Sequence, residues 1–292
     1  MKETCHSEYS NLLSVYLKPV KNAFRSEKEL EEQWETLKYL SKPDFDISLK
    51  EYEEFILFLT SRNIQYHFFP ENDKSGIDSI YCRDASIATN FGMIICNMGK
   101  KGRIYEPKAH KELYKKNEIK VLGEIKSPGT LEGGDVAWLD EKTLAVGRSY
   151  RTNEDGIRQL KKILTPKGVS VVKVELPHYK GEGDVFHLMS ILSPIDKDLA
   201  VVYSNLMPIT FREELLIRGF KLIEVPEEEF DSMGCNVLAV APRICLMLEG
   251  NPITKKLLEN AGCLVFTYKG DEISLKGGGG PSCLTRPMKR KI

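Results

Sequence analysis

Residues 134–176 read GDVAWLDEKTLAVGRSYRTNEDGIRQLKKILTPKGVSVVKVEL. Two short apolar runs, at 134–138 and 143–147, come first and are separated by charged residues, which is typical of two neighbouring strands. A helical segment then begins at Asn153, and a third apolar run at 169–176 follows it. The stretch therefore predicts one unit with the order strand, strand, helix, strand.

The same order recurs along the chain at a period of about fifty residues. The other complete units are expected at 79–89, 92–97, a helix from about Pro107 and 119–125; at 187–192, 200–203, 211–218 and 221–225; and at 236–241, 244–249, 252–261 and 263–268. A strand at 12–17, a helix at 50–59 and a strand at 64–69 form a degenerate first unit. Such repeats bury their faces against one another. We therefore expect an α/β fold in which five ββαβ units close into a ring, within a single domain that covers residues 1–292.

Charge and hydropathy exclude several classes of partner. The 42 Lys and Arg residues balance the 42 Asp and Glu residues, so the whole chain has no field that would attract nucleic acid or an anionic membrane. No apolar run approaches the roughly 20 residues that span a bilayer, and the first seven residues contain no apolar signal core. We expect a cytoplasmic protein that binds neither nucleic acid nor membranes.

The seven cysteines are an odd number and include no Cys-x-x-Cys pair, which argues against a disulfide framework and against a zinc site. Cys96 and Cys245 lie in apolar runs and are expected to be buried. The basic residues 289–291 are expected to form a solvated end.

Cys283 has a different setting, because residues 276–287 read KGGGGPSCLTRP. Four glycines allow a ligand or another strand to approach the main chain closely just before this cysteine. The stretch is not a phosphate-binding loop, since no Lys-Ser or Lys-Thr follows the glycines. A flexible tail with a chance thiol and a presented nucleophile both remain open on this stretch alone.

The ring favours the nucleophile. Asp84, Glu132, His187 and Cys283 come from the leading edges of units and are separated by 48, 55 and 96 residues. Leading edges converge on the axis of a ring, so two carboxylates, an imidazole and a thiol would meet in one central site. Singly, Asp84 could form a surface ion pair with its neighbour Arg83, and His187 could be a core histidine.

A second acidic residue lies close to Glu132. Glu132 and Asp135 flank the glycine turn Gly133-Gly134 before an apolar strand. The turn could be structural, but it places both carboxylates where a ligand can approach the backbone. We therefore expect Asp135 to bind the substrate.

Several short motifs together resemble the guanidino-group-modifying superfamily, most closely the dimethylargininases and arginine deiminases. They include DSIYCRD at 78–84, RIYE at 103–106, LEGGD at 131–135, GRSYRTN at 147–153, His187-Leu188 and GPSCLT at 280–285. The resemblance covers nearly the whole chain and implies a five-bladed α/β propeller, the pentein fold, around a central active site.

The resemblance also implies roles for single residues. Cys283 would be the nucleophile, His187 the general acid and base, and Glu132 the carboxylate that orients the histidine or binds guanidinium. Asp84 would bind guanidinium, and Arg151, with Arg103 as a less secure second, would hold the α-carboxylate of the substrate. The family needs no metal or organic cofactor, and a homo-oligomer is compatible with the sequence.

These residue types suit a guanidino substrate. Carboxylates bind the planar cation by paired, charge-assisted hydrogen bonds. A thiolate can attack its central carbon, and His187 would protonate the departing amine and then activate water, so that arginine or a methylated arginine gives citrulline. Alternatives are an amidinotransferase, which passes the amidino group to an amine, and a non-catalytic sensor of guanidino ligands.

Two positions bear on the choice of substrate. In arginine deiminases, the histidine that corresponds to His187 is usually followed by Leu-Asp, whereas this chain has Leu188-Met189. A thioether cannot accept strong N–H bonds, so an N-methylated guanidinium would lose less at this position. The chain is also shorter than typical deiminases, and Arg83 occupies a position where some dimethylargininases have a carboxylate. The sequence predicts hydrolysis of a guanidino compound, with methylarginine slightly ahead of arginine.

Overall fold

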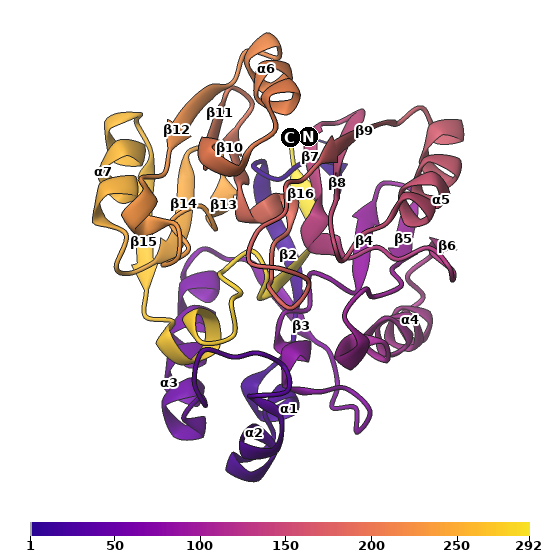
Figure 1. The fold of residues 1–292 in the computed structure, drawn as a ribbon, viewed down its shortest axis with the longest axis vertical. Helices are drawn as coiled ribbons and strands as arrows, with labels where there is room; N and C mark the ends of the chain where they lie inside the picture. Colours follow the sequence, from indigo (N-terminus) through magenta and orange to yellow (C-terminus); the bar gives the residue numbers. More distant parts are fainter. Residues whose placement is uncertain (1) are drawn as a thin grey trace.

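The structure, a computed structural model, describes residues 2–292. Within these residues, sixteen strands form five small sheets. Figure 1 shows the sheets arranged around a common centre, with the helices on the outside. The expected mixed α/β architecture and the repeating units are therefore present.

Four units lie between residues 86 and 268 and share one composition, which is two strands, a helix and a third strand. They are β4 (Ser86–Thr89), β5 (Gly92–Ile95), α4 (Glu106–Lys116) and β6 (Val121–Glu124); β7 (Val136–Asp140), β8 (Thr143–Arg148), α5 (Glu154–Leu164) and β9 (Ser170–Glu175); β10 (Leu192–Asp196), β11 (Leu199–Val202), α6 (Ile209–Ile217) and β12 (Lys221–Glu224); and β13 (Leu238–Ala241), β14 (Ile244–Leu248), α7 (Pro252–Asn260) and β15 (Leu264–Tyr268).

Each of these sheets has the same pairing. The first two strands are antiparallel and the third pairs in parallel with the second, as in β7 with β8 (Val136 opposite Val146) and β8 with β9 (Leu144 opposite Val171). A parallel pair needs a long crossover, and the helix between the second and third strands supplies it. The ββαβ order read from the sequence is confirmed.

The first unit is completed by the other end of the chain. Its sheet has the order β1 (Glu3–Thr4), β16 (Thr285–Lys291), β2 (Asn11–Leu17) and β3 (Gln65–Phe68), with α1 (Val20–Ala23), α2 (Glu27–Gln33) and α3 (Phe45–Ser61) between β2 and β3. The two chain ends accordingly lie side by side (Figure 1). Strand β16 provides the leading edge of this unit, which places Cys283 two residues before a first strand.

The expectation that residues 289–291 form a solvated end is only partly met, because Lys289 is exposed but all three residues belong to β16 and Arg290 is buried. Arg290 pairs with Leu12 in the β16–β2 ladder, is only 1% exposed, and donates to the carbonyl oxygens of Ser10 and Ala239. Burial of this strand closes the first sheet.

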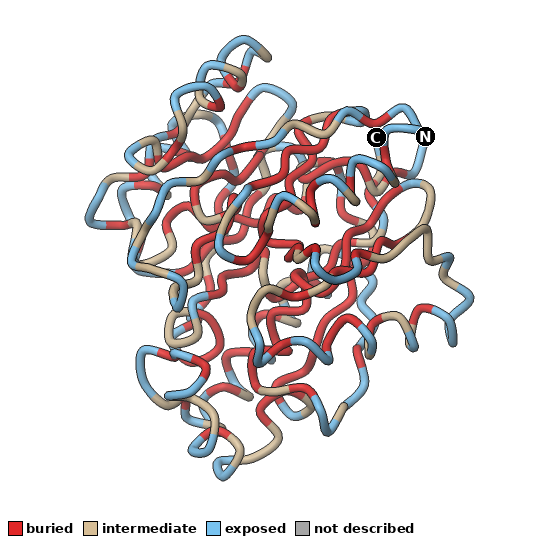
Figure 2. Tube along the Cα trace, turned by 45° about the vertical axis from the view of Figure 1, so that its right-hand side comes forward, coloured by how far each residue is buried: buried red, intermediate tan, exposed pale blue. Residues whose placement is uncertain are grey.

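Helix α5 shows how the sequence builds an outer helix. The Asn153 side chain accepts the backbone N–H of Gly156 at 2.9 Å and so caps the N-terminus. Ile157, Leu160 and Leu164 lie on one face and are buried in the apolar cluster of this part of the ring. Figure 2 shows the general result, with buried chain concentrated in the interior and exposed chain on the periphery.

Two leading strands start later than expected. The strand expected at 187–192 begins only at Leu192, because Leu188–Ser190 forms a single helical turn. The one expected at 79–89 begins at Ser86, after a helical turn at Ile77–Ile80. Irregular segments therefore precede the strands at the centre of the ring. Among residues 2–292, no helix combines the length and apolar character required to cross a membrane.

Candidate active site

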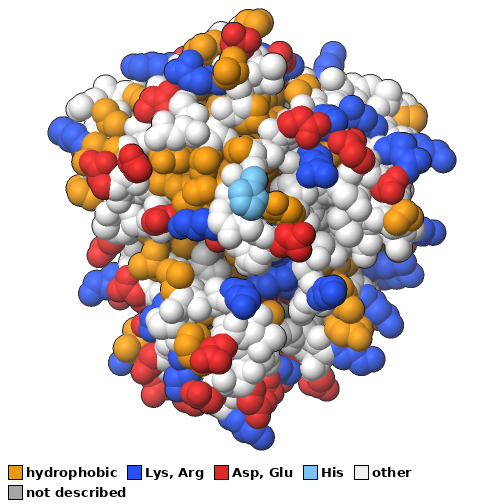
Figure 3. Space-filling view, viewed as in Figure 1, with side chains coloured by type: hydrophobic (Ala, Val, Ile, Leu, Met, Phe, Trp, Pro, Cys, Tyr) orange, Lys and Arg blue, Asp and Glu red, His pale blue; other side chains and the backbone are white. Residues whose placement is uncertain are grey.

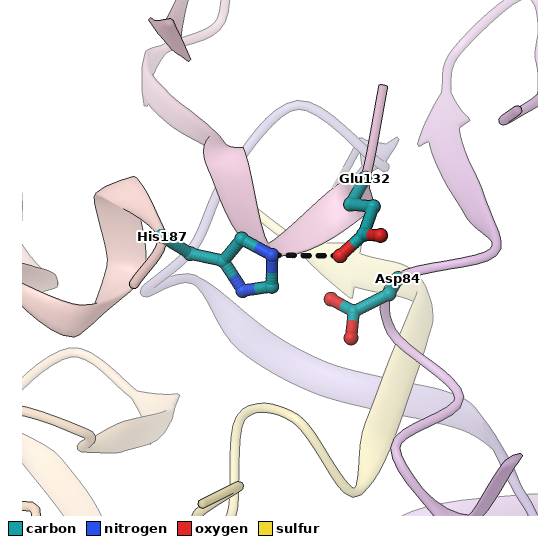
Figure 4. A group of neighbouring side chains, drawn as sticks. All are labelled: Asp84, Glu132 and His187. Atoms are coloured by element: carbon teal, nitrogen blue, oxygen red, sulfur yellow. Dashed lines mark hydrogen bonds and ion pairs between the residues drawn. The ribbon is translucent and has the colours of Figure 1, made fainter. Parts of the chain in front are cut away.

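The irregular segments that precede the first strands enclose a small cavity of about 20 Å³. Six of the seven predicted site residues line it, namely Asp84, Arg103, Glu132, Arg151, His187 and Cys283. They come from four units of the ring. Figure 4 shows three of them, with the side chains of Asp84, Glu132 and His187 directed toward one another.

Glu132 and His187 form the central pair. The Nε2 atom of His187 lies 2.9 Å from Oε2 of Glu132, whose side chain is fully buried. The other carboxylate oxygen accepts the backbone N–H of Lys100 at 2.9 Å. This geometry fixes the imidazole ring and leaves its Nδ1 edge toward Gly134, where any β-carbon would overlap with it.

Their charges stabilise each other. Burial by itself would lower the pKa of His187, but the carboxylates of Asp135, Glu132 and Asp84 outweigh burial and raise it to about 9. Burial would raise the pKa of Glu132, but His187 and Arg151 hold it well below its usual range. At neutral pH the pair is an ionised carboxylate and an imidazolium, which can act as an acid.

Asp84 presents an unpaired carboxylate oxygen. Its Oδ2 atom accepts N–H of Arg103 at 2.5 Å, and Arg103 is held in turn by Glu106 and by the carbonyl oxygen of Tyr81. Its Oδ1 atom is buried without a hydrogen-bond partner in the described chain. A buried, unsatisfied carboxylate oxygen is costly, so it marks a place for a donor that comes from a ligand.

Four N–H···O bonds of Arg103 thus go to protein atoms. Arg103 was expected as a second ligand of the substrate carboxylate, whereas in this structure it holds Asp84 in place. Arg151 is more available. It donates to the carbonyl oxygen of Asp184 at 3.2 Å and lies 3.8 Å from Glu132, while its Nε has no partner within residues 2–292.

Cys283 lies at the edge of the cavity, after the glycine run. Burial and the charge of Asp84 raise the pKa of its thiol to about 11. Its Sγ atom accepts the side-chain N–H of Asn236 at 3.3 Å. Across residues 2–292, no hydrogen bond joins Cys283 to His187, although both line the same cavity.

The glycine run is packed and is not a flexible tail. A β-carbon at Gly279 would overlap with the ring of Tyr81, and one at Gly280 would lie 2.7 Å from Cγ of Asn236. Glycine is therefore required because side chains press against the main chain. The packing delivers Cys283 to the cavity at a fixed position.

Asp135 does not line the cavity. It is fully buried behind His187, where its oxygens accept the backbone N–H of Leu188 at 3.0 Å and the hydroxyl of Ser149 at 2.6 Å. Burial raises its pKa to about 6, despite lowering contributions from His187 and from these donors. The structure thus separates Asp135 from the expected substrate ligands and uses it to support the turn after His187.

Two expectations about neighbouring positions are corrected. Met189 is 4% exposed and belongs to the apolar core, so it does not face a guanidinium in the cavity. Arg83 is 1% exposed and points into the interior, where it donates to Glu8 at 2.8 Å. The helical turn after His187 rotates Met189 away, and the turn before β4 sends Arg83 and Asp84 in opposite directions.

Sequence reasoning missed three residues at the site. Asp78 and Lys100 line the cavity and form an ion pair at 2.6 Å, and Asn236 bonds to the thiol. Asp78 is the first residue of the motif at 78–84 that also contains Asp84, so the motif could have identified it as a site residue. Asn236 occupies in the fifth unit the place that Asp84 and Cys283 occupy in theirs, and the spacing of the repeat could have identified it.

A wider cavity of about 480 Å³ adjoins the small one and shares Val185, Gly277 and Gly278 as a wall. Its apolar lining includes Tyr179, Phe186, Phe230, Met233 and Leu275. Figure 3 shows hydrophobic side chains gathered beside the centre of this face. The small cavity holds about one water molecule, so a larger ligand requires lining residues to move.

One donor atom from each of Asp84, Glu132 and His187 lies within 4.8 Å of the others, which is close enough for a metal ion. Two of these donors are bonded to each other, and Arg103, Arg151 and Lys100 add positive charge around them. The set therefore suits a planar organic cation that donates N–H groups better than a compact divalent ion. The absence of a metal in catalysis stays a prediction.

Comparison with known proteins gives consistent relatives. A family model described as "N,N dimethylarginine dimethylhydrolase, eukaryotic" matches residues 22–290. A dimethylarginine dimethylaminohydrolase of Pseudomonas aeruginosa is 28% identical over 86% of this chain and 92% of its own. An arginine deiminase of Listeria welshimeri is 27% identical over 62% of this chain and 53% of its own.

Solved structures agree on the fold. The dimethylarginine dimethylaminohydrolase of Pseudomonas aeruginosa, in a mutant complexed with citrulline, aligns with a TM-score of 0.77 and 23% identity over 96% of this chain and 99% of that one. The match of the family model spans most of the chain and contains every residue of the cavity described above. The chain therefore belongs to the N,N-dimethylarginine dimethylhydrolase family, a family of C–N hydrolases that act on amidines.

Proposed function

We propose that this protein hydrolyses the guanidino group of an N-methylated arginine to citrulline and an amine, with Cys283 as the nucleophile. The observation that carries the proposal is the buried, unpaired Oδ1 atom of Asp84 in a cavity that also contains the thiol and the Glu132–His187 pair. A guanidinium would satisfy this oxygen and bring its central carbon beside the thiol.

Each side chain then has a role. Asp84, held by Arg103, binds the guanidinium, and Arg151, whose Nε is free, binds the α-carboxylate. Glu132 orients His187 and keeps it protonated. Asp135 supports the turn that carries His187 and has no direct contact with the substrate.

The reaction proceeds in two halves. The Cys283 thiolate attacks the guanidinium carbon, the C–N bond to the methylated nitrogen breaks, and His187 gives its proton to the departing amine. The neutral imidazole then takes a proton from water, which attacks the same carbon of the thiouronium intermediate. The C–S bond breaks, the second proton of the attacking water is lost to solvent, the ureido product leaves, and the thiolate is restored.

Ionisation of the thiol requires help. With pKa values of about 11 for Cys283 and about 9 for His187, both groups carry their protons at neutral pH. A bound guanidinium adds a positive charge beside Asp84 and cancels the negative charge that raises the pKa of the thiol. Substrate binding therefore promotes the thiolate that attacks it.

Methylated arginine is favoured over arginine by the match to the family model and by the relative that covers most of both chains. The argument from Met189 no longer contributes, because this side chain lies in the core. Arginine is the second candidate, supported by the similarity to an arginine deiminase. We further propose that residues 1–292 form one catalytic domain and that the five sheets act as the blades of a propeller around it.

The test is citrulline formation from arginine, monomethylarginine and asymmetric dimethylarginine, with Cys283→Ala and Cys5→Ala run alongside. The Cys5→Ala variant is the matched control, because it removes another partly exposed thiol, which within residues 2–292 bonds to the carbonyl oxygen of Met288. Product from a methylated arginine, abolished in Cys283→Ala and kept in Cys5→Ala, is expected. Ornithine release with an amine acceptor would indicate a transferase, and binding without product would indicate a sensor.

A further inference from the structure

Asn236 is the one leading-edge residue of the ring that the proposed reaction has not used. Asp84, Asn236 and Cys283 each lie two residues before the first strand of their sheet, which are β4, β13 and β16. Glu132 and His187 also lie before the first strands of their sheets, β7 and β10, but one helical turn separates each of them from its strand. Each of the five units thus contributes one polar side chain from the same place, and in the fifth unit it is Asn236.

The contacts of Asn236 fix the orientation of its amide. Its Oδ1 atom accepts the backbone N–H of Ser282 at 3.1 Å, so the amide nitrogen faces the other way. That nitrogen donates to Sγ of Cys283 at 3.3 Å. Gly280 packs against the same side chain, since a β-carbon there would lie 2.7 Å from Cγ of Asn236. The asparagine therefore contacts the segment that leads into Cys283 and the thiol itself.

We propose that Asn236 is a catalytic residue whose amide N–H stabilises the Cys283 thiolate when it attacks the substrate and when it leaves the intermediate. The inference rests on the proposed role of Cys283 as nucleophile. An N–H donor bonds strongly to a thiolate and only weakly to a thioether sulfur. The bond therefore favours both states in which the sulfur carries charge, before C–S formation and after C–S cleavage.

A neutral amide suits this position better than a cation. Asp84 must hold a guanidinium in the same cavity, and a lysine or arginine beside the sulfur would repel that ligand. The arginines that lie closest have acidic partners of their own, since Arg83 bonds to Glu8 and Arg103 bonds to Glu106 and Asp84. Asn236 thus supplies a donor without adding charge.

The test measures the thiol directly. The rate at which iodoacetamide alkylates Cys283 is followed by mass spectrometry between pH 7 and pH 10 in the wild type, Asn236→Ala, Asn236→Asp and Asn251→Ala. At pH values below the pKa of the Cys283 thiol, the alkylation rate is proportional to the fraction of Cys283 that is thiolate. Loss of one hydrogen bond to a charged group should slow Asn236→Ala about tenfold to a hundredfold at each pH, and lower kcat/KM by a similar factor.

The other variants separate donation from packing. Asn236→Asp keeps the acceptor for Ser282 and the shape of the side chain but removes the N–H donor, so it should react at least as slowly as Asn236→Ala. Asn251 is a second buried asparagine that bonds to main-chain carbonyls before α7, and its removal should lower stability without changing the alkylation rate.

Equal alkylation rates in Asn236→Ala and the wild type, or recovery of the rate in Asn236→Asp, would overturn the proposal. Alkylation needs no substrate, so a protein that makes no citrulline would refute the proposed function while the role of Asn236 is still decided by these rates.

Discussion

Replacing Glu132 by glutamine should lower the pKa of His187, because it removes a buried charge and keeps the shape of the side chain. In the native protein Glu132 lies 2.9 Å from Nε2 of His187 and helps raise the pKa of the imidazole to about 9. A hydrogen bond to a charged group contributes about 1.5 to 3 kcal/mol, and one pH unit corresponds to about 1.4 kcal/mol. The pKa of His187 should therefore fall by about one to two pH units, to about 7 to 8.

The sign follows from the role of the imidazolium. His187 must be protonated to release the amine, so activity falls as the pH rises through its pKa. In Glu132→Gln, the fall in kcat at alkaline pH should move to lower pH by about one to two units, which is the expected decrease in the pKa of His187. At pH 7 the variant should retain part of its activity, and at pH 9 it should lose nearly all.

The imidazole can be observed without relying on kinetics. The chain has five histidines, so NMR titration of labelled imidazoles, assigned with His187→Asn, reports the pKa of His187 itself. Glu229→Gln is the matched control, because Glu229 is an equally buried carboxylate that caps α7 through Ile253 and Thr254. An unchanged His187 titration in Glu132→Gln would refute this account of the site.

Three further changes test other features of the molecule. Met189→Asp should lower the free energy of unfolding by about 3 to 5 kcal/mol in urea titrations, because it buries an unpaired charge, and a gain in arginine turnover would contradict the structure. Gly134→Ala should reduce kcat sharply with the fold retained in circular dichroism, because its methyl group overlaps with His187, whereas Gly183→Ala meets nothing within 4 Å and should keep kcat. Burial holds the pKa of His110 well below its ordinary value, so the folded protein keeps this imidazole neutral. As the pH falls below about 6.5, the unfolded chain takes up a proton at His110 and the folded state does not, so the free energy of unfolding decreases. His110→Phe should therefore lose less unfolding free energy between pH 7 and pH 5 than the wild type, and an equal loss would contradict the assignment.

The repeating units could be predicted because their signal is local. Apolar runs, turns and helical segments occur in the same order four times, and each unit makes its own sheet. Strand β16 could not be predicted in this way, because its sequence TRPMKRK is basic and carries no apolar alternation. Only its pairing with β2, from the far end of the chain, explains why Arg290 is buried.

The site was predictable in position and less so in detail. The spacing of Asp84, Glu132, His187 and Cys283 was enough to place them around one cavity. The directions of Asp135 and Met189 depend on single helical turns beside Glu132 and His187, which periodicity does not reveal. Whether a residue faces the cavity or the core is decided there by one or two residues of backbone.

The cavity also depends on contacts between units, which ties the chemistry to closure of the ring. Glu132 of the third unit accepts N–H from Lys100 of the second and bonds to His187 of the fourth. Asn236 of the fifth unit binds the segment that leads into β16 and so reaches the first unit. Glu132, His187 and Cys283 are therefore each held by contacts from a neighbouring unit, whereas Asp84 is held by Arg103 of its own unit. Cys283 is held from two sides, because its thiol bonds to Asn236 of the fifth unit and its carbonyl oxygen accepts the backbone N–H of Arg83 of the second. Opening the ring at either contact would therefore move the thiol relative to the other residues of the cavity.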